Sequence, residues 1–127
     1  GFYKFLSPLQ NIELGLSLRK ADISKEKIIL TLNKFELGNY INKSVGIFSK
    51  GMLQRLKFAY ASLLDWKVGL LDEPLNGLDD EGVKLFNECI ELWIENKQSV
   101  LLVAHNTGYI TYSNYDTIYL KNKKISS

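Results

Sequence analysis

Two short apolar runs in the second half of the chain place the strongest constraint on its fold. They are Val68–Leu71 and Val100–Ala104. Between them lies Gly82–Glu95, where apolar residues recur at helical spacing. Short apolar runs that alternate with a helix are typical of buried strands in a parallel sheet. The order strand, helix, strand therefore predicts an α/β fold with a mainly parallel sheet.

The first half of the chain carries helix signals and no strand signal. Each of its three predicted helices follows a serine that can cap the first turn: Pro8–Leu18 after Ser7, Lys25–Phe35 after Ser24, and Lys50–Leu64 after Ser49. Gly38 is expected to end the second helix. Three elements are expected near the C-terminus: a short helix over Thr107–Tyr112, a strand over Thr117–Leu120, and its partner Lys124–Ser126 beyond a turn at Asn122. This pattern predicts a helical subdomain over residues 1–64 and part of an α/β core over residues 65–127.

The first apolar run ends in two carboxylates, Asp72 and Glu73. Ligands of open parallel sheets bind at the carboxyl ends of the strands. Because successive strand side chains point in different directions, one carboxylate could hold a hydrated magnesium ion while the other faces an attacking water. The alternative is a polar strand end that merely opens a loop. This segment alone does not decide between the two.

The start of the third predicted helix is a second candidate site. Free N–H groups and the helix dipole attract an anion there, and Ser49 adds a hydroxyl donor. Gly51 would let a phosphate come close to the backbone. Taken alone, a Ser-x-Gly pattern is more often an ordinary helix cap.

The second apolar run ends at His105, the only histidine of the sequence. A lone histidine after a strand is more often structural than functional. Its strand is nevertheless expected beside the one that ends in Asp72, so the ring could reach the same phosphate as the carboxylates. Between the two runs, Leu75–Asp79 contains an Asn-Gly turn, and Asp79 could cap the helix that follows.

In order and spacing, these segments together resemble an ATP-binding-cassette (ABC) ATPase. Four motifs carry the resemblance: the signature motif at Ser49-Lys50-Gly51-Met52, the Walker B strand at Val68–Glu73, the D-loop at Leu75–Asp79, and the switch histidine at His105. The resemblance covers nearly the whole chain, and the four motifs in register are far more specific than any one of them. It implies a P-loop NTPase-like fold, with ATP and Mg²⁺ as cofactors.

The resemblance also implies roles for single residues. Asp72 would act on the magnesium ion through water, and Glu73 would be the general base for the hydrolytic water. His105 would contact the γ-phosphate and sense its presence.

Other roles implied by the resemblance lie between subunits. Two such ATPase domains sandwich two nucleotides head to tail, so Ser49 and Gly51 would bind the γ-phosphate of ATP held by a second subunit. Asp79 would lie at the dimer seam. Lys50 and Met52 stand where the signature usually has glycine and glutamine, and this form resembles the signatures of export-type cassettes.

One part of the family pattern is missing from this sequence. No Gly-x-x-x-x-Gly-Lys-Ser/Thr pattern, the Walker A loop, occurs in it. That loop supplies the lysine and the N–H nest for the β- and γ-phosphates. We therefore expect this chain alone to bind ATP poorly, to hydrolyse it negligibly, and to leave apolar faces bare. A further expected partner is a segment or separate chain that carries Walker A.

The resulting interpretation is part of the ATPase subunit of an ABC transporter that couples ATP hydrolysis to export through a membrane permease. The residues Asp80-Glu-Gly-Val83 resemble haem-exporter ATPases of cytochrome c maturation, but the signature resembles drug, lipid or polysaccharide export ATPases at least as well, so the substrate stays open. Exposed apolar residues within Phe2–Leu18 are candidates for the permease contact. Two alternatives are a non-catalytic remnant that acts as a scaffold, and a non-transport ABC ATPase of translation or DNA repair.

Charge and hydropathy limit the other partners. A formal net charge of +2 does not call for nucleic acid. Neither apolar run approaches the roughly 20 residues of a membrane-spanning helix, so we expect a peripheral protein docked on a permease at the cytoplasmic (or mitochondrial matrix) face. The single cysteine, Cys89, falls in the apolar pattern of a predicted helix and is expected to be a buried thiol.

Overall fold

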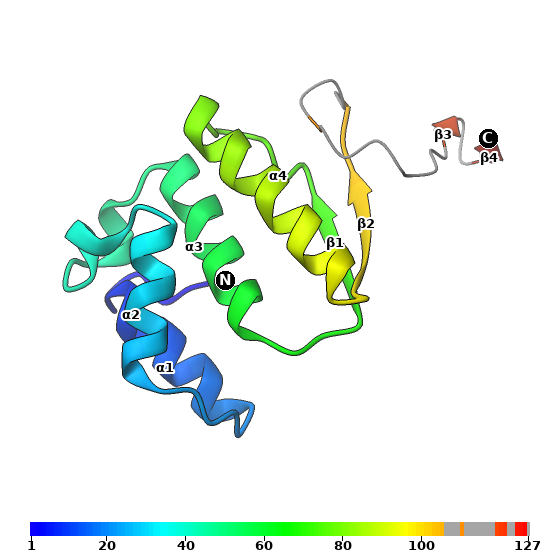
Figure 1. Cartoon of the computed structure of the whole chain (residues 1–127). Coiled ribbons are helices and arrows are strands. Elements are labelled where there is room, and N and C mark those ends of the chain that lie inside the picture. The colour runs from blue at the N-terminus through cyan, green and yellow to red at the C-terminus, as the bar shows by residue number, and fades with distance from the viewer. Residues whose placement is uncertain (106–109, 111–118, 122–123, 127) are drawn as a thin grey trace.

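The computed structural model of this chain describes residues 1–105, 110, 119–121 and 124–126. The elements follow one another in this order: α1 (Pro8–Leu18), α2 (Lys25–Lys34), the 3-10 turns η1 (Gly38–Tyr40) and η2 (Val45–Ile47), α3 (Lys50–Leu63), β1 (Val68–Asp72), α4 (Asp80–Glu95), β2 (Ser99–Val103), β3 (Tyr119–Lys121) and β4 (Lys124–Ser126). Figure 1 shows α4 lying between α3 and the β1–β2 sheet, with α1 and α2 on the far side of α3.

The predicted strand–helix–strand unit is confirmed. Strands β1 and β2 pair in parallel, from Val68 opposite Ser99 to Asp72 opposite Val103, and α4 connects them (Figure 1). The bounds predicted for the two strands, Lys67–Leu71 and Val100–Ala104, are each shifted by one residue from those observed, an ordinary error for strand ends. Strands β3 and β4 pair with each other in antiparallel fashion and form a separate sheet.

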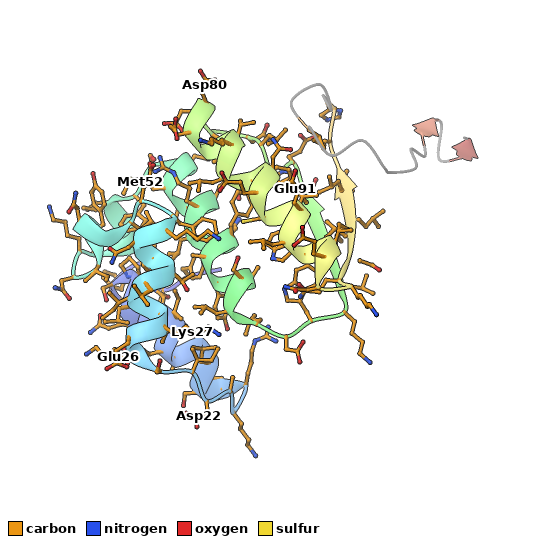
Figure 2. The ribbon with its side chains drawn as sticks, viewed as in Figure 1. Asp22, Glu26, Lys27, Met52, Asp80 and Glu91 are labelled. Carbon is orange, nitrogen blue, oxygen red and sulfur yellow. The ribbon has the colours of Figure 1, made fainter. Side chains whose placement is uncertain are left out.

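The predicted serine caps are confirmed. Ser7 and Ser24 each accept a hydrogen bond from a backbone N–H of the first turn that follows, and Ser49 caps α3 in the same way. Glu26 and Lys27, in the first turn of α2 and labelled in Figure 2, are both exposed.

The second helix ends within one residue of its predicted end, but the role given to Gly38 in ending it is wrong. Helix α2 stops at Lys34, and the residue in left-handed conformation is Glu36, with φ of 60°. The N–H of Leu37 then donates to the carbonyl of Leu32 at 2.9 Å. Leu37 is fully buried, so packing of this side chain imposes the turn before Gly38 is reached. Gly38 instead opens η1.

A single apolar core runs through the helical layer and under the sheet. Helix α3 is its centre: the Phe58 ring lies 5.4 Å from the ring of Phe86 on α4, measured between centroids. Cys89 of α4 is buried as predicted. Its burial raises the pKa of the thiol to about 11, although a hydrogen bond with Ser62 acts in the opposite direction.

The junction between α3 and β1 is fixed by aromatic packing. The rings of Trp66 and Trp93 lie 5.2 Å apart between centroids, edge to face. The indole N–H of Trp66 donates to the carbonyl of Ala61 at 2.9 Å, and the side chain of Gln98 donates to the carbonyl of Trp66 at 2.9 Å. The predicted boundary at residues 64 and 65 therefore falls in a tightly held connection.

The expectation of buried strands holds for only one face of the β1–β2 sheet. Leu71 and Leu102 point towards the core, whereas residues on the opposite face are exposed. The large apolar side chains of that face, called the bare face below, are 46–74% exposed: Val68, Leu70, Leu101 and Val103. Parallel strands are normally covered on both faces, so this sheet presents one apolar face without a covering layer among the described residues.

Two expectations near the C-terminus concern residues outside or partly outside the described part of the chain. The predicted helix Thr107–Tyr112 lies outside it, except for Ile110. The predicted strand Thr117–Leu120 corresponds in part to β3, and its predicted partner coincides with β4.

Candidate functional site

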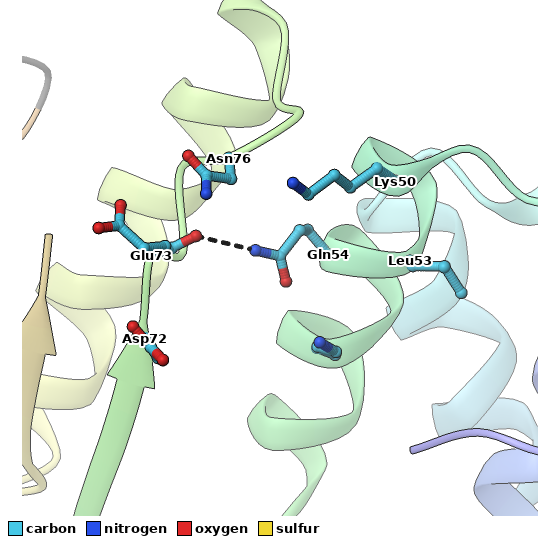
Figure 3. A pocket seen from close by; sticks show the side chains of 7 residues that line it. Lys50, Leu53, Gln54, Asp72, Glu73 and Asn76 are labelled. Atoms are coloured by element: carbon cyan, nitrogen blue, oxygen red, sulfur yellow. Dashed lines mark hydrogen bonds between the residues drawn. The ribbon is translucent and has the colours of Figure 1, made fainter. Parts of the chain in front are cut away.

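The carboxyl end of β1, the segment after it and the first two turns of α3 surround a cavity of about 210 Å³. Figure 3 shows it from close by, with Asp72, Glu73 and Asn76 on one side and Lys50, Leu53 and Gln54 on the other. Lys57 completes the lining. Two lysines and two carboxylates therefore face the same space, where they can attract both an anion and a cation.

The two predicted acidic residues occupy the strand tip. Asp72 is the last residue of β1 and is exposed on the same face as Leu70. Glu73 follows it with φ of 46°, a left-handed conformation that costs a residue other than glycine about 1–3 kcal/mol. The N–H of Glu73 donates to the carbonyl of Val103 at 2.6 Å and ties the turn to β2. The strand and this turn thus send the two carboxylates in different directions.

His105 lies beside Glu73. Its Nε2 is 3.3 Å from Oε1 of Glu73, and the imidazole is almost completely exposed. The parallel pairing of β1 and β2 brings the two residues together because it aligns the carboxyl ends of both strands. An exposed pair of this kind contributes little to stability. What matters for function is that a carboxylate and an imidazole lie together at the carboxyl edge of the sheet, where a ligand could meet both.

Ser49 lies at the start of α3 and is exposed. Its Oγ accepts a hydrogen bond from the N–H of Met52 at 3.1 Å. A hydroxyl both accepts and donates, so this cap leaves the Ser49 proton available to an anion. Lys50 is exposed and points across the cavity towards Asn76 (Figure 3). Met52 is half-buried and packs against the core.

Gly51 packs against the D-loop backbone. A Cβ at this position would lie 2.5 Å from the carbonyl oxygen of Gly77. Gly77 itself has φ of 79°, a conformation that favours glycine. The sequence argument explained Gly51 by the approach of a phosphate. The structure adds a separate requirement, close contact between α3 and the segment after β1.

Asp79 caps α4, as predicted, by accepting a hydrogen bond from the N–H of Gly82 at 2.8 Å. Its second carboxylate oxygen lies 3.9 Å from a guanidinium nitrogen of Arg55. Arg55 also contacts Glu36 at 3.4 Å. This arginine, to which the sequence analysis gave no role, links α3 to the end of α2 and to the start of α4.

Gln54 is the second residue to which the sequence analysis gave no role. It is buried, and its Nε2 donates to the carbonyl oxygens of Glu73 and Pro74, both at 3.2 Å. Its position three residues after Gly51 puts it on the same face of α3. That spacing is the signal that could have indicated a contact with the strand tip.

The donor atoms suit magnesium only in part. No group of three or more His, Cys, Asp or Glu side chains able to hold a metal exists among the residues that the structure describes. Mg²⁺ commonly takes one or two carboxylates and completes its shell with waters and substrate phosphates. Asp72 fits the role of such a carboxylate, so a magnesium ion here would depend on the phosphates of a bound nucleotide.

Comparison with known proteins identifies relatives by sequence. No protein-family model matches the chain. It is 35% identical over 103 residues to the lantibiotic transport ATP-binding protein SrtF of Streptococcus pyogenes, which covers 81% of this chain and 44% of SrtF. It is 36% identical over 108 residues to the ABC transporter ATP-binding protein NatA of Bacillus subtilis, covering 83% and 44%. It is 30% identical to the thiamine import ATP-binding protein ThiQ of Haemophilus influenzae, covering 98% and 59%. The chain thus spans about half the length of these relatives.

Solved structures with the same fold are ABC cassettes. The dimeric bacterial ABC transporter cassette MJ0796 superposes with a TM-score of 0.73 at 22% identity, over 87% of this chain and 50% of that one. An ABC transporter ATP-binding protein of Pyrococcus furiosus superposes with a TM-score of 0.72 at 20% identity, over 85% and 54%. At this identity the likeness shows the fold, a P-loop NTPase-like α/β fold.

Proposed function

Because this chain is homologous to the ATP-binding proteins of ABC transporters and has the fold of ABC ATPase cassettes, we propose that it forms part of the ATPase subunit of such a transporter. The observation that carries the proposal is the strand tip. Asp72 and Glu73 end β1 in different directions, and His105 lies 3.3 Å from Glu73 at the end of the neighbouring strand. Phosphoryl transfer requires mainly this kind of positioning and charge stabilisation.

Each residue of the strand tip has a role in this proposal. Glu73 orients the attacking water and accepts its proton. Its carboxylate is accessible to such a water, since it is partly exposed and lines the cavity. His105, whose Nε2 lies 3.3 Å from Glu73, would contact the γ-phosphate. Asp72 holds Mg²⁺ through water, and the ion, when bound, neutralises phosphate charge.

The signature residues act on a second subunit. Ser49, Lys50, Gly51 and Met52 open α3, and the first two are exposed, so they are accessible to a nucleotide held by a partner ATPase. Asp79 is also exposed and lies at the seam of the same dimer. The cassette MJ0796, which has this fold, is dimeric in two solved structures, one of them bound to ADP and Pi, and this supports a second ATPase subunit. The head-to-tail arrangement is part of our proposal.

A segment that carries Walker A completes the domain. Residues 1–64 form the helical subdomain and residues 65–127 the C-terminal part of the α/β core. The completing segment, in the same polypeptide or in a separate chain, covers the bare face. The relatives are about twice as long as the matched region, which supports a missing half of this size. Without it, the chain described here binds and hydrolyses ATP poorly.

The partner at the membrane is a permease, which places the ATPase peripherally on the cytoplasmic or mitochondrial matrix face. No described helix is long and apolar enough to cross a membrane. The candidate contact surface lies near the N-terminus, where Tyr3, Phe5 and Leu18 are 60%, 96% and 72% exposed.

The direction of transport rests on weaker support. The Ser-Lys-Gly-Met signature favours export, and Asp80–Val83 favours the haem-exporter type of cytochrome c maturation. The relatives include a lantibiotic transport protein and a thiamine import protein, so they do not favour one direction. Neither alternative function, a scaffold without catalysis or an ATPase of translation or DNA repair, is supported by these relatives.

The decisive experiment replaces Glu73 in the full-length protein that carries this chain. We expect Glu73→Gln to lower ATP turnover by about 10²–10⁴-fold, with ATP binding retained, because the amide cannot accept the proton of the water. The matched control is Glu91→Gln, an exposed carboxylate on α4 outside the cavity (Figure 2). Turnover of Glu73→Gln equal to that of the control would show that Glu73 is not the general base, and no turnover in the unmutated full-length protein would indicate a scaffold instead of an ATPase.

A further inference from the structure

Helix α3 is attached to the catalytic end of β1 by the side chain of Gln54. Its Nε2 donates to the carbonyl oxygens of Glu73 and Pro74, each at 3.2 Å, and the first of these bonds is drawn in Figure 3. Only 9% of Gln54 is exposed. A side chain without this N–H donor would leave both carbonyl oxygens without their hydrogen bond from α3, and an unpaired buried acceptor is costly.

The backbone of Glu73 depends on several such bonds. Its N–H donates to Val103 at 2.6 Å, and its carbonyl accepts from the N–H of Asn76 at 3.2 Å as well as from Gln54. These bonds hold φ at 46°, which this residue would otherwise avoid. The direction of a side chain follows the backbone that carries it. The carboxylate of Glu73 is therefore aimed by partners on β2, on the D-loop and on α3.

Among these partners of Glu73, Gln54 is the one on α3, called the signature helix below because the signature motif lies at its start. It lies one turn after Gly51, which is in close contact with the carbonyl of Gly77. Arg55, the next residue, reaches Asp79. Helix α3 therefore holds the segment from Glu73 to Asp79 at its beginning, middle and end.

We propose that Gln54 is a positioning residue that orients Glu73 for catalysis and links that orientation to the position of the signature helix. The proposal rests on the function proposed above, in which Glu73 is the general base. A movement of α3, such as one caused by a nucleotide bound at Ser49, changes the position of the Gln54 amide and with it the aim of the Glu73 carboxylate in the same subunit.

The test uses two variants in the full-length protein. Gln54→Leu removes the donor at similar volume, and Gln54→Glu replaces it with a group that repels both carbonyls when ionised. We expect kcat for ATP to fall about 10- to 100-fold, the range that a small misplacement of a reacting group causes, with KM changed less than about 2-fold. Measured against the unmutated protein at the same pH, the relative kcat of the glutamate variant should rise as the pH falls, because a protonated carboxyl can donate to one carbonyl again. The ratio corrects for protonation of Glu73, which both proteins share.

Gln98→Leu is the matched control. Gln98 also uses Nε2 to bind a backbone carbonyl from another part of the chain, that of Trp66 at 2.9 Å. Trp66 precedes β1, whereas the cavity lies at the carboxyl end of that strand, and neither Gln98 nor Trp66 lines it. We expect it to lose stability in urea denaturation to an extent comparable with Gln54→Leu, and to keep kcat. If Gln54→Leu behaves in the same way as this control, Gln54 has a structural role only and the proposal is wrong.

A double variant separates this proposal from the function on which it rests. In the Glu73→Gln background, Gln54→Leu should cause no further loss of residual turnover, because the group that Gln54 orients is already gone. An additional 10-fold loss there would overturn the positioning role. If Glu73→Gln alone leaves turnover unchanged, the general base has been assigned wrongly and the function proposal fails first.

Discussion

The helical layer and the β1–β2 sheet of this protein bury their apolar residues to very different extents. In the helical layer, Leu32 and Leu56 are fully buried, whereas Val68 and Leu70 on the sheet are 74% and 67% exposed. Helices α1 to α3 therefore complete their own core with α4, while the sheet requires a layer that the described residues do not supply.

The largest expected effect comes from breaking the helical layer. Phe58 of α3 is 2% exposed and packs on Phe86, so Phe58→Ala should lower the free energy of unfolding by about 3–5 kcal/mol. Urea denaturation followed by circular dichroism would measure it. The control is Phe5→Ala, at a position 96% exposed, for which we expect a change within about 0.5 kcal/mol. Similar losses of unfolding free energy in both variants would show that burial of Phe58 in the helical layer contributes no more to stability than an exposed ring.

A second prediction compares the bare face in two forms of the protein. In the 127-residue chain, Leu70→Ala should change the free energy of unfolding by less than about 0.5 kcal/mol, because the side chain is largely exposed. In the full-length protein the same change should cost about 2–5 kcal/mol. Leu71→Ala, on the face that packs against the core, should be costly in both forms. A small effect of Leu70→Ala in the full-length protein would mean that the bare face stays uncovered.

A third prediction concerns the contact between the two regions. Gly51→Ala places a Cβ 2.5 Å from the backbone oxygen of Gly77, so we expect a loss of about 1–3 kcal/mol from overpacking. Gly82→Ala is the control. Its Cβ would meet the flexible end of Leu78 at 2.9 Å, which can move aside, so the loss should be smaller. Thermal unfolding of both variants would show the difference, and a harmless Gly51→Ala would leave phosphate approach as the better reason for this glycine.

Local signals explain most of what the sequence predicted. Serine caps and apolar spacing act within a few residues, so α1, α3 and α4 were found with small boundary errors. The strand pair followed from the strand–helix–strand order, and with it the proximity of Glu73 and His105.

The errors and omissions involve contacts between distant parts of the chain. The end of α2 is set by the burial of Leu37, and the usual preference for a glycine did not reveal it. The contacts of Gln54 and Arg55 depend on how α3 packs against the segment after β1. Residue type and local spacing contain no information on such packing. The bare face was expected in general terms, since a missing segment was expected, but its residues are known only from the sheet register.

The junction of Trp66 and Trp93 has a practical consequence for spectroscopy. These are the only two tryptophans of the sequence, and they form a contact between the α3–β1 connection and α4. Intrinsic fluorescence excited at the indole band is therefore a local optical reading of one place in the molecule. A shift of the emission maximum signals that the connection between the helical layer and the sheet has opened. Melting of α1 or α2 alone leaves the emission unchanged, because neither helix carries a tryptophan. Combining emission with circular dichroism would thus time the separation of the two regions without any added dye.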